Sequence, residues 1–225
     1  MKGGKIIMRI SVAIDGPAGA GKSTIAKLVG KKFDLMYINT GAMYRAVALL
    51  AKKNDISTTN IEALMTMIDN MEMHFENDDL ILDGVNIQNE ITMPEISEIV
   101  SNYASIPEVR SKLVSLQRKM SEKYNVIMDG RDIGTVVLKN SKFKFFLTAT
   151  PEERARRRYT ELLNRGLDVN YDKLLEDIIK RDHIDSTRAV DPLRKADDAI
   201  EIDSSNYNIN EVTEIICNFI ENALQ

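Results

Sequence analysis

The sequence predicts an α/β fold in which a five-stranded parallel sheet is flanked by helices. Short β-rich runs alternate with longer helical patterns along the 225 residues, as in chains built from βαβ units. A glycine-rich segment also separates the first β run from the first helical pattern, which is typical of a nucleotide-binding core. The five expected strands are residues 9–14, 36–39, 125–129, 143–147 and 199–202.

One stretch departs from this alternation. Residues 72–88 contain three short apolar runs (MHF, LIL, VNI), and Asp83-Gly84 between the last two is a strong hairpin signal. We therefore expect a small antiparallel sheet inserted at about residues 61–93. The length suits one α/β unit with insertions over residues 1–225 better than two independent domains.

Composition excludes several classes of protein. With 28% charged residues and no long uncharged apolar run, a membrane span is not expected, and Met1–Met8 carry no export signal, so we expect a cytoplasmic protein. The net charge of −4 argues against polymeric nucleic acid as a partner. The single Cys217 excludes an intrachain disulfide, and His74 and His183 lack metal-ligand spacing.

The glycine-rich segment fits the phosphate-binding pattern GxxxxGK[ST]. Its glycines let backbone N–H groups turn toward phosphate oxygens, and the following helix adds the positive end of its dipole. The alternative, a turn that contains the pattern by chance, is disfavoured by the strand before it and the helix after it. The predicted ATP-binding residues are Gly16, Pro17, Ala18, Gly19, Ala20, Gly21, Lys22, Ser23 and Thr24.

Two oxygen ligands are candidates for Mg²⁺. The Ser23 hydroxyl follows the phosphate-binding lysine and is the natural ligand. Asp129, at the end of the third expected strand, could hold a metal-bound water or could only open the turn at Gly130.

Two later helices carry arginines. At 100° per residue, Arg154, Arg157, Arg158 and Arg165 of the helix at 152–165 share one arc, in which Glu161 is the only acid. Such a face could close over a transferring phosphoryl group, or it could be an ordinary exposed basic surface.

In the next helix, expected over residues 171–189, Arg181, Asp185 and Arg188 follow the spacing i, i+4, i+7. They continue a stripe with Leu174 and Ile178, so they should point inward. A carboxylate between two guanidinium groups would hold them for a ligand, and this role is favoured over a surface ion pair.

Together these motifs resemble the bacterial cytidylate kinase family, over about residues 10–219. The resemblance rests on the phosphate loop, on TGAMYR at 40–45, on DGRDIGTVV at 129–137, and on the arginine and aspartate positions of 181–190. It implies a core of residues 8–40, 120–150 and 190–225, a monophosphate-binding region at about 41–119, a lid at 151–170 and a substrate-binding helix at 171–189.

The resemblance also implies roles for individual residues. It places Ser101, Arg110 and Asp132 at the base, Arg45, Arg131, Arg181 and Arg188 around the phosphate, Asp185 at the sugar, and Thr40 among them. It adds Arg154, Arg157 and Arg158 to the ATP site, and makes Lys22, Arg131, Arg157 and Arg188 catalytic. Asn39 departs from the family in replacing a frequent acid, and Thr40 could also cap a helix that starts at Gly41.

The expected activity is reversible transfer of the γ-phosphoryl group of Mg·ATP to CMP or dCMP by a monomer. The nearest alternative is another kinase of this fold that acts on AMP, UMP or shikimate. A nucleotide-dependent switch is more remote, because the chain has no NKxD element for reading guanine.

Overall fold

The structure is a computed structural model that describes residues 9–224. Residues 1–8, for which no export signal is expected, lie outside the described part. At its centre is a five-stranded sheet in the order β2-β6-β1-β7-β8, and each strand pairs in parallel with its neighbours. The strands are β1 (Ser11–Asp15), β2 (Met36–Asn39), β6 (Val126–Gly130), β7 (Phe143–Thr148) and β8 (Ile200–Asp203). All five predicted strands are confirmed, and no end differs by more than two residues.

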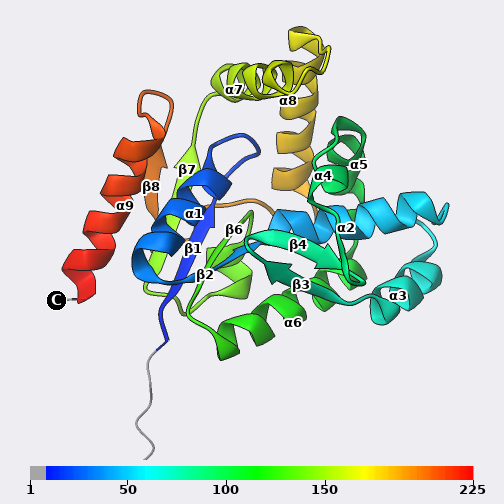
Figure 1. Ribbon diagram of the computed structural model, residues 1–225, viewed down its shortest axis with the longest axis horizontal. Helices are drawn as coiled ribbons and strands as arrows, with labels where there is room; N and C mark the ends of the chain where they lie inside the picture. The colour runs from blue at the N-terminus through cyan, green and yellow to red at the C-terminus, as the bar shows by residue number, and fades with distance from the viewer. Residues whose placement is uncertain (1–8, 225) are drawn as a thin grey trace, which may run out of the picture.

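Helices cover both faces of this sheet because the strand side chains alternate between two apolar cores. Val12 and Ile14 face one core, which is covered by α1 (Lys22–Phe33) and α9 (Ile209–Leu224). Ala13 faces the other, which is covered mainly by α2 (Thr40–Lys53) and α6 (Pro107–Lys123). Figure 1 shows α1 and α9 together on one side of the sheet. Cys217, a residue of α9, lies buried in this core.

The predicted insertion is also present. The strands β3 (Met73–Glu76), β4 (Asp79–Leu82) and β5 (Val85–Asn86) form an antiparallel sheet of their own. It is preceded by α3 (Ile61–Asn70) and followed by α4 (Gln88–Ile91) and α5 (Pro94–Ala104). Leu80 and Leu82 join the core beneath α2, so the insertion is part of the same globular body.

The remaining elements lie at the carboxyl ends of the parallel strands. Figure 1 shows α7 (Pro151–Asn164) and α8 (Tyr171–Thr187) beyond the ends toward which β1 and β7 run. A short π-helix, η1 (Ile133–Val137), directly follows the segment after β6. Ligands of open parallel sheets bind at this edge, so these elements surround the expected site.

Two predicted helices are present, but one of them ends and the other begins at a slightly different residue than expected. The helix expected over residues 171–189 ends at Thr187, and Arg188 has left it with ψ of 144°. Thr40 does not cap a helix that begins at Gly41; α2 begins at Thr40 itself, and the Asn39 side chain caps it by accepting from the Ala42 N–H at 2.9 Å. Within residues 9–224, no helix has the length and apolar character needed to cross a bilayer.

Candidate active site

The phosphate loop connects the end of β1 to the start of α1. Gly16 has φ of +144°, and a Cβ there would lie 2.0 Å from the Leu147 carbonyl oxygen, so only glycine allows this path. No described side chain caps the first turn of α1, which leaves its backbone N–H groups free to bind an anion. Of the other predicted ATP-binding residues, Ala20 is buried and Thr24 is exposed in that first turn.

Lys22 is buried within this loop. Its side chain is only 5% exposed, and Nζ donates to the Pro17 carbonyl at 2.7 Å. Burial, and next the positive charge of Arg131, hold the pKa of Lys22 well below its ordinary value. An anion bound here would raise this pKa again.

Ser23 and Asp129 are brought together, as the metal prediction requires. The Ser23 hydroxyl donates to Asp129 Oδ2 at 2.9 Å, and the Tyr37 hydroxyl donates to Asp129 Oδ1 at 2.8 Å. Hard oxygen donors of this kind suit Mg²⁺, which binds through few protein ligands and otherwise keeps waters and phosphate oxygens. Residues 9–224 contain no cluster of three or more histidine, cysteine or acidic side chains that could hold a metal.

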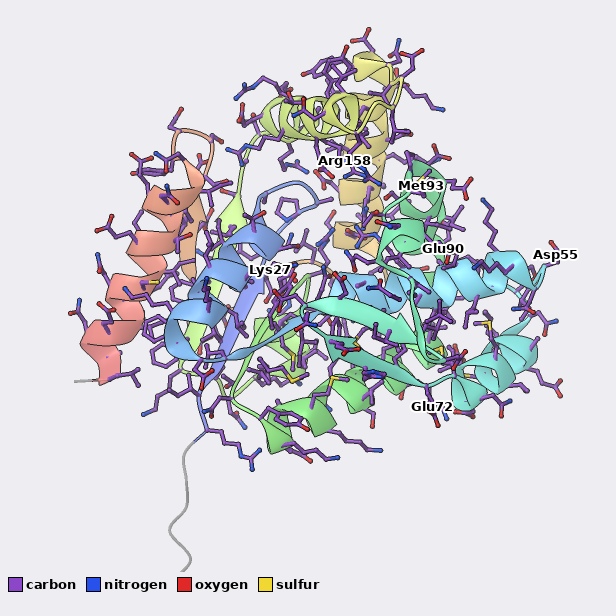
Figure 2. The ribbon with its side chains drawn as sticks, in the orientation of Figure 1. Lys27, Asp55, Glu72, Glu90, Met93 and Arg158 are labelled. Carbon is purple, nitrogen blue, oxygen red and sulfur yellow. The ribbon has the colours of Figure 1, made fainter. Side chains whose placement is uncertain are left out.

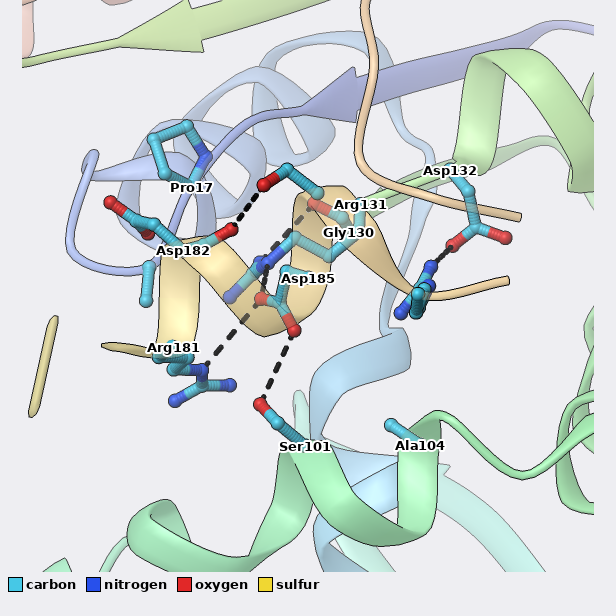
Figure 3. Close-up of polar contacts among 12 residues, drawn as sticks. Pro17, Ser101, Ala104, Gly130, Arg131, Asp132, Arg181, Asp182 and Asp185 are labelled. Atoms are coloured by element: carbon cyan, nitrogen blue, oxygen red, sulfur yellow. Dashed lines mark hydrogen bonds and ion pairs between the residues drawn. The ribbon is translucent and has the colours of Figure 1, made fainter. Parts of the chain in front are cut away.

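A second group of charged residues surrounds Asp185, which is only 3% exposed (Figure 3). Its carboxylate accepts from Arg131 Nε at 2.8 Å and from the Ser101 hydroxyl at 3.2 Å, and it lies 3.8 Å from Arg181 Nε. The predicted partner Arg188 makes no hydrogen bond to this carboxylate, but it lies near it: burial raises the pKa of Asp185, and the charges of Arg131, Arg181 and Arg188 together lower it below its ordinary value. Because α8 ends at Thr187, Arg188 donates instead to the Asp191 carbonyl and to Asp132, and Arg131 bonds Asp185.

Two arginines in this region carry buried donors that lack an acceptor. Nε of Arg45 and Nε of Arg181 have no hydrogen-bond partner among the described residues. Burial, and next the charge of Arg131, lower the pKa of Arg45 to about 10 and that of Arg181 to about 9. Arg131 thus acts on three cations, Lys22 included. Mutual repulsion of this kind is relieved when an anion binds between the cations.

The residues expected at the base form a connected network. Arg110, 1% exposed, donates to Asp132 through one terminal nitrogen, to Asp191 Oδ2 at 3.2 Å and to the Ala104 carbonyl at 3.2 Å. Arg188 donates to the Asp191 carbonyl and to Asp132 at 3.4 Å. Burial raises the pKa of Asp132. Ser101 is separated from this pair, because its hydroxyl is on Asp185.

Thr40 lies between the two halves of the site. Its hydroxyl donates to the Asp129 carbonyl at 2.7 Å, so α2 is attached at its first residue to the end of β6. Tyr44, four residues further, has a buried hydroxyl without a described partner, and its ring lies 5.6 Å from the Arg110 guanidinium.

The arginines of α7 differ from the sequence prediction in their partners. Arg154 is 2% exposed and bonds Asp182 at 2.5 Å and the Ala18 carbonyl at 3.0 Å, so it fastens α7 to α8 and to the phosphate loop. Arg157 donates to Glu153 at 2.9 Å and to the Ser204 carbonyl at 2.6 Å. The basic arc is therefore largely neutralised, because Glu153 adds a second acid that the helical projection placed outside the arc.

Arg158 and Arg165 reach from α7 to the insertion. Arg158 donates to Glu161 at 2.6 Å and to the Thr92 carbonyl at 3.3 Å, and Arg165 donates to the Thr92 hydroxyl at 3.4 Å. Figure 2 shows Arg158 on the side of α7 that faces the segment Glu90–Met93. The predicted lid thus contacts the predicted monophosphate-binding region.

Sequence reasoning missed several residues of the site. Asp15, Tyr37, Asp182 and Asp191 all bond predicted site residues or the segment that carries them. Of these four residues, only Asp15 could have been found from the sequence, because an acid is unusual at the end of the apolar run RISVAI, directly before the phosphate loop. The others depend on contacts between distant parts of the chain.

Comparisons with known proteins agree with this geometry. Residues 12–222 match the family model described as cytidylate kinase. The chain is similar to a cytidylate kinase of Clostridium perfringens, with 66% identity over 212 residues that cover 94% of this chain and 98% of the relative. It is 59% identical to a cytidylate kinase of Clostridium acetobutylicum over 217 residues, which cover 96% and 100% of the two chains.

A solved structure is similar in fold alone. It is an uncharacterized protein from Eubacterium ventriosum, with a TM-score of 0.51 at 15% identity, and the match covers 95% of this chain and 99% of that one.

Proposed function

The chain belongs to the cytidylate kinase family, and on this premise we propose that it reversibly transfers the γ-phosphoryl group of ATP to CMP or dCMP. One observation carries the proposal. The buried Nε groups of Arg45 and Arg181 lack an acceptor among the described residues, and after burial it is the charge of Arg131 that lowers the pKa of both and of Lys22 in the phosphate loop. This cluster of repelling cations suits two phosphorylated ligands that meet at Arg131.

The donor is proposed to bind along the phosphate loop. Backbone N–H groups of residues 16–24 would hold its phosphates, and Lys22 would contact the β and γ phosphates. Mg²⁺ would be held by Ser23 directly and by Asp129 through water, and it would neutralise charge on the phosphate oxygens. Of the α7 arginines, Arg157 and Arg158 are the candidates to reach the transferring group, because Arg154 is already held by Asp182 and the loop.

The acceptor is proposed to bind on the far side of Arg131. Arg45, Arg131, Arg181 and Arg188 would hold its phosphate, and Asp185 its sugar. No protein base is needed, since a nucleoside monophosphate is already anionic at neutral pH. An acceptor phosphate oxygen attacks the γ phosphorus, the bond to the β–γ bridging oxygen breaks, and ADP leaves. The chain contributes alignment, charge neutralisation and exclusion of water.

A preference for cytosine follows from the two residues proposed to contact the base, Arg110 and Asp132. Cytosine presents an amine that donates and an N3 that accepts, and uracil reverses both. Asp132 can accept from the amine and Arg110 can donate to N3 and O2, whereas UMP would set a carbonyl oxygen against the Asp132 carboxylate. A site built on hydrogen bonds rejects such a mismatch strongly.

The test is a panel of acceptors supplied with Mg·ATP, namely CMP, dCMP, UMP, AMP and shikimate. We expect CMP and dCMP to be phosphorylated, with kcat/KM at least about 100-fold above that for UMP. A folded Lys22→Ala variant should lose turnover by orders of magnitude. Equal rates with UMP or AMP, or product from shikimate, would overturn the assignment.

A further inference from the structure

Asp15 has no assigned role in the reaction, yet it joins the two halves of the site. It is the last residue of β1 and directly precedes Gly16, the first residue of the phosphate loop. Its side chain is directed toward the segment after β6, where Oδ1 accepts from the Ile133 N–H and Oδ2 from the Gly134 N–H, each at 2.7 Å. One carboxylate therefore bonds the first two residues of η1.

These two bonds connect the donor side to the acceptor side. Ile133 and Gly134 directly follow Arg131 and Asp132, the residues proposed to hold the acceptor phosphate and the base. Within the sheet, Asp15 is paired with Gly130, so the backbone is held before this segment and the Asp15 side chain holds it afterwards. Arg131 and Asp132 lie between two points that are both fixed to the end of β1.

The contact is tightly built. Asp15 is 3% exposed, and no described lysine or arginine donates a hydrogen bond to it, so the two N–H groups are its only described hydrogen-bond partners. Gly134 allows the approach, because a Cβ there would lie 3.3 Å from Asp15 Oδ2 and 3.2 Å from Lys144 Cδ. A buried carboxylate is costly unless such bonds satisfy it. An apolar residue could not make both bonds from this position.

We propose that Asp15 is a positioning residue, which holds the acceptor-binding segment 131–134 at a set distance and orientation from the phosphate loop. The inference rests on the proposed function, because it concerns how the acceptor is aligned with the donor phosphate. Small misplacements of reacting groups can reduce a rate by about 100-fold, so a carboxylate that acts only through backbone contacts can still determine turnover.

The decisive variant is Asp15→Asn. It keeps the size of the side chain, but its NH₂ group must face one of the two backbone N–H groups, so one bond is lost and the segment is displaced. Gly134→Ala keeps the carboxylate but crowds it from the other side, because the added Cβ would lie 3.3 Å from Asp15 Oδ2. Asp198→Asn is the matched control, because it removes an exposed carboxylate that pairs with Lys144 at 2.8 Å, beside Gly134, and leaves the Asp15 bonds intact.

All variants are measured as the full chain, with CMP titrated at saturating Mg·ATP, and with Mg·ATP affinity determined by calorimetry in the absence of CMP. For Asp15→Asn we expect kcat/KM for CMP to fall about 100-fold, through both kcat and KM, with unchanged affinity for Mg·ATP. Gly134→Ala should show a smaller loss of the same kind, and Asp198→Asn wild-type kinetics. A purely structural role for Asp15 would lower ATP affinity as well.

The inference fails if folded Asp15→Asn has wild-type kinetics, or if its ATP affinity falls as much as its kcat/KM for CMP. If Asp15→Asn does not fold, Gly134→Ala decides, and wild-type kinetics in that variant would overturn the inference. The unmodified chain is assayed beside them. If it does not phosphorylate CMP, the proposed function itself fails, whereas an active wild type beside an unaffected variant rejects only the role of Asp15.

Discussion

Arg131 affects more of the charged residues of this site than any single hydrogen bond would suggest. Its Nε bonds Asp185 at 2.8 Å, and its charge lowers the pKa of Lys22, Arg45 and Arg181. The site is consequently under electrostatic strain that bound phosphates would relieve. In the proposed function, discrimination of the base depends on two other residues, Arg110 and Asp132, which bond each other.

Asp15 allows a prediction about pH and stability. Burial raises its pKa from 3.8 to about 7 in the folded chain. Because the folded state then binds a proton that the unfolded state has lost, this group's contribution to the free energy of unfolding is fully present below about pH 4 and falls as the pH rises toward 7. From about pH 5 to about pH 8, the wild type should lose on the order of 2 kcal/mol relative to Asp15→Asn.

Urea denaturation of both proteins at several pH values measures this difference. The asparagine variant also loses a hydrogen bond, but that cost does not change with pH, so the slope of the difference reports the carboxyl group alone. A difference that stays constant, or that favours the wild type as the pH rises, would contradict the raised pKa.

Among the elements, α2 carries both Thr40 and Arg45 into the site, and its start is fixed by Asn39. We expect Asn39→Ala to cost about 1 kcal/mol of stability through loss of the cap. It should also raise KM for CMP, because the first turn of α2 would fray beside the acceptor.

Asn60→Ala is the matched control for this prediction. Asn60 caps α3 in the same way, accepting from the Ala63 N–H at 3.2 Å, but it lies on the exposed side of the insertion. Thermal unfolding should show similar losses for the two variants, and kinetics should show a raised KM only for Asn39→Ala. An equal effect on KM would mean that the cap matters only for global stability.

The helix α7 is held at one end and bonded more weakly at the other. Arg154 anchors it to the phosphate loop and to α8, while Arg158 and Arg165 reach the insertion only through bonds of 3.3 and 3.4 Å to Thr92. Two of its arginines form ion pairs within the helix, Arg157 with Glu153 and Arg158 with Glu161. Arg157 and Arg158 must exchange these carboxylates for phosphate if they are to act in transfer.

For the molecule as a whole, binding of each substrate should appear as added stability. A ligand that binds only the folded state stabilises it by about 2.7 kcal/mol when present at about 100 times its Kd. We expect ATP and CMP each to raise the Tm of the wild type. In Lys22→Ala the ATP-dependent shift should be largely lost and the CMP-dependent shift retained, because the two anion sites are separate.

Lys27→Ala is the control for this prediction, since Lys27 also lies in α1 but is exposed and faces Asp78 of the insertion at 3.8 Å. It should keep both shifts. Loss of the CMP shift in Lys22→Ala would mean that the two ligands share one site and would contradict the arrangement proposed above.

The sequence alone determined the sheet, its insertion and the phosphate loop of this protein. These features follow from local patterns: short β-rich runs such as residues 143–147, the Asp83-Gly84 turn, and a glycine motif between a strand and a helix. Hydrophobic periodicity and turn chemistry act over a few residues, so they can be read without knowledge of the rest of the chain. Family resemblance then supplied the acceptor residues, whose roles stay predictions.

Only the tertiary structure decided which charges meet. Helical spacing predicted a contact of Arg188 with Asp185, but the helix ends before Arg188, and the hydrogen bond to Asp185 comes from Arg131, 54 residues away. The bonds of Asp15 span 118 and 119 residues, and that of Tyr37 to Asp129 spans 92. Each such pairing depends on how strands and helices pack against one another. This packing brings together groups that are far apart along the chain, and no local sequence pattern predicts their contact.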